Sequence, residues 1–249
     1  MKTFFALLVR IGLVFVCLGL GSVAAPAALA QPRPATPDPV LVIGGFDADQ
    51  GILEKLREAL DQWGYSAFSM VLPAVPSLSG APTGSAPIAE SAGAVAQAVD
   101  EIRRETGAAR VDLVGHSMGG LAARHYVKFL GGGESAGTYV DLGTPNSGQS
   151  LGFLCSLFWP GCRDIAPGSP FLRALNQPPA VPPGLAAYHL FSEDQGAERE
   201  PLPGAVNASV QDFCPGRNVI HRNEPRDGAF QELIVSALRG GPLATTCPR

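Results

Sequence analysis

Residues 110–120 read R-V-D-L-V-G-H-S-M-G-G, and this stretch decides how the rest of the chain is interpreted. Its first part, residues 110–114, is mostly aliphatic and predicts a strand, and a helix is expected directly after the turn. G-x-S-x-G between a strand and a helix is typical of a nucleophile elbow, a sharp turn that raises a serine hydroxyl into a cleft. Glycine at Gly115 and Gly119 avoids the clash that side chains would make there. We therefore predict that Ser117 is a nucleophile; the alternative is an ordinary serine in a glycine-rich turn.

Two backbone N–H groups are expected to bind the oxyanion that forms when a serine attacks a carbonyl group. The first belongs to Met118, at the N-terminus of the helix that follows the turn. The second is expected from the loop after the first strand, where Gly44 and Gly45 let the backbone come close and Phe46 supplies the N–H. A plain strand-ending turn is the other interpretation of this loop. A nucleotide-binding loop is a poor fit, because neither G-x-G-x-x-G nor G-K-[ST] follows.

Strands and helices alternate along the chain, as in proteins that have a mostly parallel sheet covered on both faces. Continuous apolar runs predict buried strands, and apolar residues at helical spacing predict the helices between them. The predicted strands are 39–43, 65–72, 110–114, 138–142, 186–191 and 208–213, and the predicted helices are 53–63, 88–107, 122–130 and 229–238. We therefore predict an α/β fold with a mostly parallel central sheet flanked by helices. Residues 73–87, rich in Pro, Ser, Gly and Ala, are expected to form a mobile surface loop.

A serine hydroxyl is a weak nucleophile until a base takes its proton, and the chain has four histidines that could do so. His116 is expected to point away from the serine hydroxyl. His125 is expected to lie on a helix, and His189 inside an apolar strand. His221 lies in a polar loop between the last predicted strand and the last helix, where the chain order serine, acid, histidine places the base. We predict that His221 is the base; a surface histidine in an arginine-rich loop is the alternative.

An acidic residue is expected to accept the other imidazole N–H, which fixes the tautomer and stabilises the imidazolium. It should follow the strand that precedes the histidine, and Glu193 and Asp194 lie just after the predicted strand 186–191. We choose Asp194, with Glu193 as the direct rival, because a one-residue slip in the turn decides between them. Asp141, after the fourth strand, is a third candidate. Asp227 could instead cap the last helix.

The first thirty residues match an export signal. Lys2 and Arg10 accompany an apolar run over residues 11–25, and A-L-A at residues 28–30 fits the small-x-small pattern before a signal-peptidase cut. We expect cleavage near Ala30 and a secreted chain of residues 31–249 that forms a single domain. An uncleaved membrane anchor is the alternative, because the apolar run is nearly long enough to span a bilayer.

Four cysteines remain after the predicted cut, and an even number in an exported chain favours two disulfides. Cys155 and Cys162 are close enough in sequence to close a local loop, and Cys214 would then tie the C-terminal tail at Cys247. The two other ways of pairing the four cysteines stay open. Zinc binding is disfavoured because neither C-x-x-C nor H-x-x-x-H spacing occurs, and we expect no metal site.

The composition fits a globular chain and excludes several classes. The 249 residues are 46% hydrophobic and 16% charged, which argues against collagen, a coiled coil or a disordered chain. The net charge is −4 and no basic stretch is longer than Arg103-Arg104, so no nucleic-acid partner is expected. Residues 146–185 interrupt the alternation with an apolar segment. This segment is either a satellite cluster at the edge of the domain or a small cap that lines an acyl-binding cleft.

A second motif, downstream of the elbow, carries a family resemblance. V-G-H-S-M-G-G at residues 114–120, followed by L-G-T-P-N-S-G at residues 142–148, resembles the secreted bacterial lipases and esterases of the α/β-hydrolase superfamily, such as class 2 lipases. The likeness covers residues 39–240 and includes the C-P-G-R run that leads to His221. Two positions depart from the family pattern. Many relatives carry His-Gly where this chain has Gly44-Gly45, and many carry their catalytic histidine nearer the last helix.

The resemblance implies an α/β-hydrolase fold and the hydrolysis of carboxylic esters without a cofactor. The expected substrate is a small-molecule or lipid ester, with transient contact to a lipid interface, and we expect a monomer. Under this hypothesis Ser117 attacks the ester carbonyl, His221 takes and returns the proton, and Asp194 orients His221. An acyltransferase or a peptidase could use the same groups, and an inactive exported binding protein on this scaffold is the alternative from another class.

Overall fold

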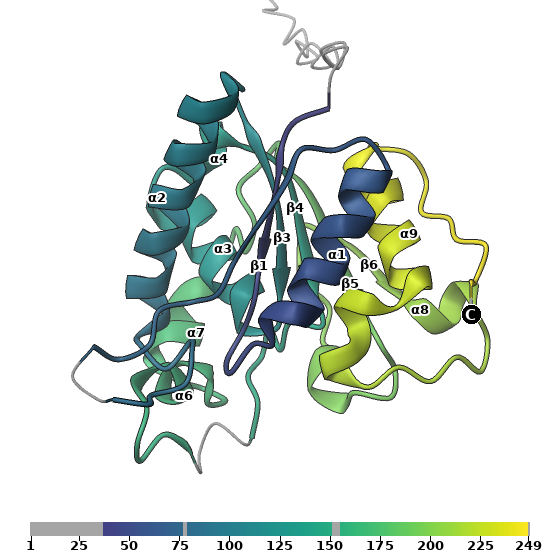
Figure 1. Ribbon diagram of the computed structural model, residues 1–249. Helices are drawn as coiled ribbons and strands as arrows, with labels where there is room; N and C mark the ends of the chain where they lie inside the picture. Colours follow the sequence, from purple (N-terminus) through teal and green to yellow (C-terminus); the bar gives the residue numbers. More distant parts are fainter. Residues whose placement is uncertain (1–36, 77–78, 151–154, 249) are drawn as a thin grey trace, which may run out of the picture. The chain divides into compact units, whose positions relative to one another are not determined.

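Six parallel strands form one sheet in the order β2-β1-β3-β4-β5-β6 (Figure 1). The computed structural model describes residues 37–76, 79–150 and 155–248, so the predicted export signal lies outside the described residues. The chain divides into two units, residues 1–33 and 34–249, and all that follows concerns the second. The strands are β1 Val40–Ile43, β2 Ala67–Met70, β3 Val111–His116, β4 Ala136–Leu142, β5 Ala186–Phe191 and β6 Val206–Ser209. The predicted parallel sheet is therefore confirmed.

Helices cover both faces of this sheet, as predicted. They are α1 Gln50–Gln62, α2 Ile88–Thr106, α3 Met118–Phe129, α4 Gly132–Ser135, α6 Pro160–Ile165, α7 Pro170–Leu175, α8 Val210–Phe213 and α9 Gly228–Leu238, with 3-10 turns η1 Gly196–Glu198 and η2 His221–Arg226. Figure 1 shows α2 and α3 on one side of the sheet and α1 and α9 on the other. Each side has its own apolar core, with Val95 and Leu121 buried in one and Leu56 and Phe230 in the other. Among the described residues, no helix has the length and apolar character that a membrane span requires.

The last strand differs from its predicted bounds. Residues 208–213 were expected to be extended, but β6 ends at Ser209 and a short helix, α8, begins at Val210. The side chain of Ser209 accepts a hydrogen bond from the backbone N–H of Asp212 (3.1 Å), and the Asp212 carboxylate accepts one from the backbone N–H of Ser209 (2.7 Å). This reciprocal pair is a capping box, which starts a helix in spite of the apolar residues that follow.

The loop over residues 73–87 is only partly the surface loop that its composition predicts, since Pro76, Ser79 and Gly80 are exposed but its second half is not. Gly84, Ser85 and Ala86 are buried. The backbone carbonyl of Thr83 accepts a hydrogen bond from the N–H of Asp47 (2.8 Å). The side-chain hydroxyl of Thr83 accepts a second one from the N–H of Ala48 (3.0 Å). The second half of the loop therefore supports the segment that follows β1, which carries the expected oxyanion donor.

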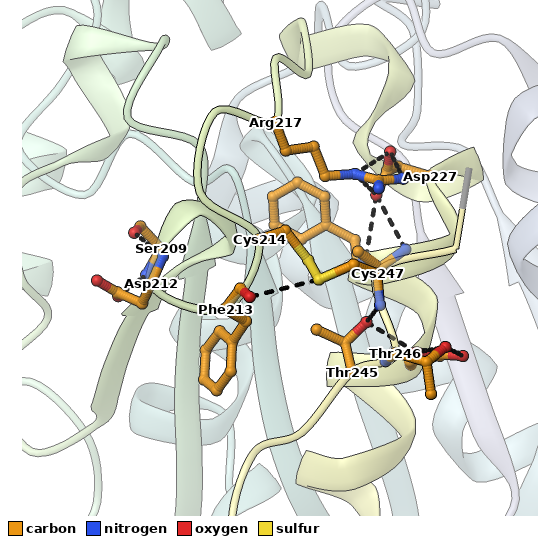
Figure 2. The surroundings of a disulfide bond; sticks show 12 residues. Ser209, Asp212, Phe213, Cys214, Arg217, Asp227, Thr245, Thr246 and Cys247 are labelled. Atoms are coloured by element: carbon orange, nitrogen blue, oxygen red, sulfur yellow. Dashed lines mark hydrogen bonds and ion pairs between the residues drawn. A yellow bond between two sulfur atoms is a disulfide. The ribbon is translucent and has the colours of Figure 1, made fainter.

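Two disulfides join the cysteine pairs that sequence spacing favoured. Cys155 is bonded to Cys162, and Cys214 to Cys247. The second bond attaches the C-terminal tail to the end of α8, where the disulfide sulfur of Cys247 also lies 3.4 Å from the carbonyl oxygen of Phe213 (Figure 2). In the same region Asp227 caps α9, as the sequence suggested, by accepting hydrogen bonds from the first N–H groups of that helix.

Replacing Cys214 and Cys247 together by serine should lower the free energy of unfolding by about 4 kcal/mol, because the bond closes a loop of 33 residues. The matched replacement of Cys155 and Cys162 should cost only about 2 kcal/mol, because that loop has 7 residues. Urea unfolding of both double variants, followed by circular dichroism, measures the difference. Equal losses would contradict this account.

Candidate active site

Ser117 lies at the sharp turn between β3 and α3, as predicted. Its backbone angles, φ 57° and ψ −127°, are rare for a residue with a side chain and store about 1–3 kcal/mol of strain. The turn is held by the Ser117 N–H, which donates to the carbonyl of Leu142 (2.9 Å), and by Thr144, whose hydroxyl donates to the Ser117 carbonyl (3.1 Å). A Cβ at Gly115 or Gly119 would lie within 2.5 Å of neighbouring backbone atoms. A side chain at either elbow glycine would therefore clash with the backbone.

The two expected oxyanion donors lie beside the elbow. Met118 is the first residue of α3, so its N–H has no partner within the helix. Gly45 lies against the elbow so closely that a Cβ there would be 2.8 Å from Ser117 Cβ and 3.1 Å from the nitrogen of Met118. Phe46 follows directly and lines the same cavity as Ser117. The loop after β1 thus lies against the elbow, and Phe46 stays the predicted second donor.

One cavity of about 190 Å³ brings the predicted nucleophile and the predicted base together. Its walls come from the loop after β1, the elbow and η2, and they include Phe46, Ser117 and His221. Arg222 and Asp49 form an exposed ion pair, 3.6 Å apart, and both also line the cavity. None of the cavity's lining residues belongs to the described part of the 146–185 segment. The predicted role of that segment as a cap therefore stays a prediction.

His221 is paired with a carboxylate that the sequence analysis did not choose. Its Nδ1 lies 2.7 Å from Oε1 of Glu198, the last residue of η1. Oε2 of a second glutamate, Glu224, lies 3.4 Å from the same nitrogen. Both glutamates are buried, with 3% and 0% exposure. Two carboxylates therefore lie near Nδ1 of the imidazole. Nε2 is the ring nitrogen that is left for proton exchange with another group.

The choice of Asp194 is corrected by this geometry. Asp194 is exposed, and its carboxylate accepts hydrogen bonds from the N–H of Val219 (3.3 Å) and from the side chain of Gln211 (3.3 Å). The rival Glu193 is exposed too, and the third candidate, Asp141, is paired with His189. The carboxylate that contacts His221 nevertheless comes from the expected segment after β5. The carboxylate at His221 lies further along because the chain continues to Gln195 and turns back through η1, which places Glu198 at His221.

Glu224 is a second residue that the sequence analysis missed. It lies three residues after His221, on the same 3-10 turn, and this spacing was the available signal. Its carboxylate packs against Gly143, where an added Cβ would lie 1.9 Å from Oε2. The glycine of the L-G-T-P motif therefore makes room for Glu224.

His116, inside the elbow, contacts the predicted base. The two rings lie 4.6 Å apart, and Nε2 of His116 lies 3.0 Å from the carbonyl oxygen of His221. It also lies 3.4 Å from Oε2 of Glu224. Both neighbours are acceptors, so Nε2 carries the proton. Burial, followed by the positive charge of His221, lowers the pKa of His116 to about 3, and this ring is therefore neutral.

The electrostatics of the site favour a positively charged His221. Burial alone would lower its pKa, but the hydrogen bonds and charges of Glu198 and Glu224 outweigh burial and raise the pKa to about 10. Burial raises the pKa of Glu198 to about 8, and the nearby Glu224 carboxylate adds to this rise, while the hydrogen bond from His221 opposes it.

The other two histidines lie where the sequence placed them. His125 is on α3 and packs against the rings of Phe129 and Phe171. His189 is on β5 and fully buried. Within the described ranges, His116, His221 and Glu224 also place ligand atoms within 4.8 Å of one another, close enough to hold a cation. Their contacts with one another and with Glu198 account for this arrangement, so we assign none of them to a metal.

Three features together define the class of the α/β hydrolases: a parallel sheet, a nucleophile elbow after β3, and a histidine–carboxylate pair that follows the last two strands. A family model described as lipase (class 2) matches residues 37–198. The chain therefore belongs to the class 2 lipase family. The match includes Ser117 and Glu198 and ends before His221.

Solved structures show the same fold. The chain is 16% identical to Aspergillus fumigatus lipase B, with a TM-score of 0.68 over 84% of this chain and 54% of that one. It is 15% identical to the mature form of Bacillus licheniformis lipase BlEst2, with a TM-score of 0.56 over 72% of this chain and 86% of that one. A Listeria innocua protein is 17% identical, with a TM-score of 0.54 over 84% of this chain and 96% of that one. The chain spans about half the length of the Aspergillus lipase.

The His221 imidazole should carry a proton on both nitrogens at neutral pH, because its pKa is raised to about 10. Glu224→Gln removes one of the two carboxylates and should lower that pKa by about 1 to 2 pH units. A ¹⁵N NMR titration of the histidine rings measures both values. Asp194→Asn is the matched control and should leave the titration of His221 unchanged. A Glu224→Gln titration that coincides with the wild-type curve would show that Glu224 does not act on His221.

Proposed function

We propose that this protein is an exported serine hydrolase that cleaves carboxylic esters, lipid esters among them, through an acyl-enzyme on Ser117. The observation that carries the proposal is that Ser117, raised on its strained elbow, lines the same cavity as His221, whose Nδ1 is held by Glu198. Membership of the class 2 lipase family supports ester substrates. The two disulfides support export, because such bonds persist in oxidising compartments.

The reaction follows from the roles of these groups. The Ser117 oxygen attacks the ester carbonyl carbon, and Nε2 of His221 takes the hydroxyl proton and returns it to the leaving alcohol. The N–H groups of Phe46 and Met118 bind the oxyanion of the tetrahedral intermediate. Water then attacks the acyl-enzyme with His221 as base, and the carboxylic acid leaves. Glu198 takes the role that the sequence analysis gave to Asp194: it orients His221 and stabilises the imidazolium.

Contact with a lipid interface is supported by two exposed apolar side chains. Leu157 and Phe158 lie in the loop that the Cys155–Cys162 disulfide closes, with exposures of 83% and 69%. Adjacent bulky apolar side chains with this exposure are unusual on a soluble surface and fit transient contact with lipid. We expect the protein to act as a monomer.

Ser117→Ala and His221→Ala should each lower kcat by about 10⁵-fold or more, because the nucleophile and its base act as a unit. Glu198→Gln should lower kcat by about 10²- to 10⁴-fold, because the imidazole loses its orienting charge. Hydrolysis of short- and long-chain p-nitrophenyl esters, with a fluorophosphonate label on the serine, measures these losses.

Asp194→Asn is the matched control for Glu198→Gln and should stay within about threefold of wild type. Unchanged ester hydrolysis in Ser117→Ala would refute the proposal. A wild-type serine that neither hydrolyses esters nor reacts with the fluorophosphonate would instead favour an inactive binding protein. Alcohol and amine acceptors in the same assay separate a hydrolase from an acyltransferase, and peptide substrates test for a peptidase.

The value of kcat/KM should rise with pH into the alkaline range. His221 must be neutral to accept a proton, and a raised pKa means that the neutral form grows as the pH rises toward about 10. The pH profile of kcat/KM with a soluble ester measures this. Glu224→Gln lowers the pKa of His221 and should move the rising limb to lower pH. A limb centred near pH 6.5 in the wild-type protein would contradict the prediction.

A further inference from the structure

A second histidine–carboxylate pair lies beneath the candidate site and takes no part in the chemistry described above. His189 on β5 and Asp141 on β4 are register partners on neighbouring strands, and both side chains have 0% exposure. Nδ1 of His189 contacts Oδ1 of Asp141. A fully buried pair of ionisable groups costs several kcal/mol in desolvation, and apolar side chains of similar size would often be as stable. Stability alone therefore gives little reason for this pair.

The pair is held rigidly on its carboxylate side. Oδ2 of Asp141 accepts hydrogen bonds from the amide of Asn146 (3.0 Å) and from the hydroxyl of Tyr139 (3.3 Å). Burial would lower the pKa of His189, but the charge and hydrogen bonds of Asp141 outweigh burial and raise it. Both ring nitrogens of His189 face acceptors, Oδ1 of Asp141 and the backbone carbonyl of Glu198, and the ring is therefore fixed in orientation.

The other nitrogen of this ring reaches the candidate active site. Nε2 of His189 donates a hydrogen bond of 2.7 Å to the backbone carbonyl of Glu198. Glu198 is the residue whose carboxylate holds His221, and it ends η1, a turn of only three residues. So short a turn has little hydrogen bonding of its own, and its position depends on contacts with the sheet.

We propose that His189 is a positioning residue, which fixes the backbone of Glu198 through its Nε2–H so that the Glu198 carboxylate meets Nδ1 of His221. This inference rests on the proposed function only in that it makes Glu198 the acid of the site. Asp141 acts one step further back, by holding the His189 ring. A chain of contacts then runs from the buried sheet to the nucleophile through Asp141, His189, Glu198 and His221.

Two amide variants separate this role from a structural one. The side-chain N–H₂ of glutamine stands where Nε2 of histidine does, and that of asparagine stands where Nδ1 does. His189→Gln therefore keeps the donor to the Glu198 carbonyl, whereas His189→Asn keeps a donor to Asp141 and loses the one to Glu198. Both remove the buried imidazole. His125→Gln and His125→Asn are the matched controls on α3, away from the site.

We expect His189→Asn to lower kcat by about 10²-fold with little change in KM, because misplacement by about 1 Å costs a rate of that order. His189→Gln should keep kcat within about fivefold of wild type. An NMR titration should show a lowered pKa of His221 in the asparagine variant alone. Thermal unfolding reports how far each variant is destabilised, and the two His125 variants should retain wild-type kcat.

Equal losses of kcat in the two His189 variants, with His221 titrating as in wild type, would overturn the proposal. If His189→Asn does not fold, the glutamine variant decides alone: a folded His189→Gln protein with kcat lowered 100-fold is incompatible with the donor role. The titration needs no substrate. A lowered His221 pKa in a chain that proves inactive on esters would therefore support the positioning role while refuting the proposed function.

Discussion

The ion-pair contact between Nδ1 of His221 and Oε1 of Glu198, 2.7 Å long, is the interaction on which the candidate site depends. It joins the turn after β5 to the turn after β6, and it occupies Nδ1, so that Nε2 is the nitrogen left for proton transfer. Without it, only Glu224 and the ring of His116 would hold the His221 imidazole. The strained elbow would then present its hydroxyl to a less firmly held ring.

The all-parallel sheet explains why residues so far apart in sequence can make this contact. Ser117 follows β3, Asp141 lies near the end of β4, Glu198 follows β5 and His221 follows β6. The carboxyl ends of parallel strands lie at one edge of the sheet, where α/β proteins bind their ligands. Each of these four strands therefore places one group at the same edge of the sheet. The register of β4 and β5 places Asp141 beside His189.

The fold and the nucleophile could be predicted from sequence because local patterns determine them. The elbow needs glycines at fixed offsets from Ser117, and buried parallel strands appear as continuous apolar runs. The acid could not be predicted in this way, because Glu198 is brought to His221 by the path of a turn. That path depends on a contact between the Glu198 carbonyl and His189, which no short window of sequence contains. His116 was missed for the same reason, since its contact with His221 comes from packing across the fold. Glu224 did carry a local signal, its spacing of three residues from His221.

The two glutamates have opposite consequences for the reaction. They raise the pKa of His221, so little of the resting imidazole is neutral at neutral pH and able to act as a base. In the transition state of the proposed reaction, however, His221 would carry the positive charge that these carboxylates stabilise, within a buried site where such charges interact strongly. Glu198, with its pKa raised to about 8, holds a proton next to Glu224 below that pH, which weakens the attraction on His221. The neutral ring of His116 fits this balance, because a second positive charge 4.6 Å from His221 would cancel the stabilisation that the glutamates provide.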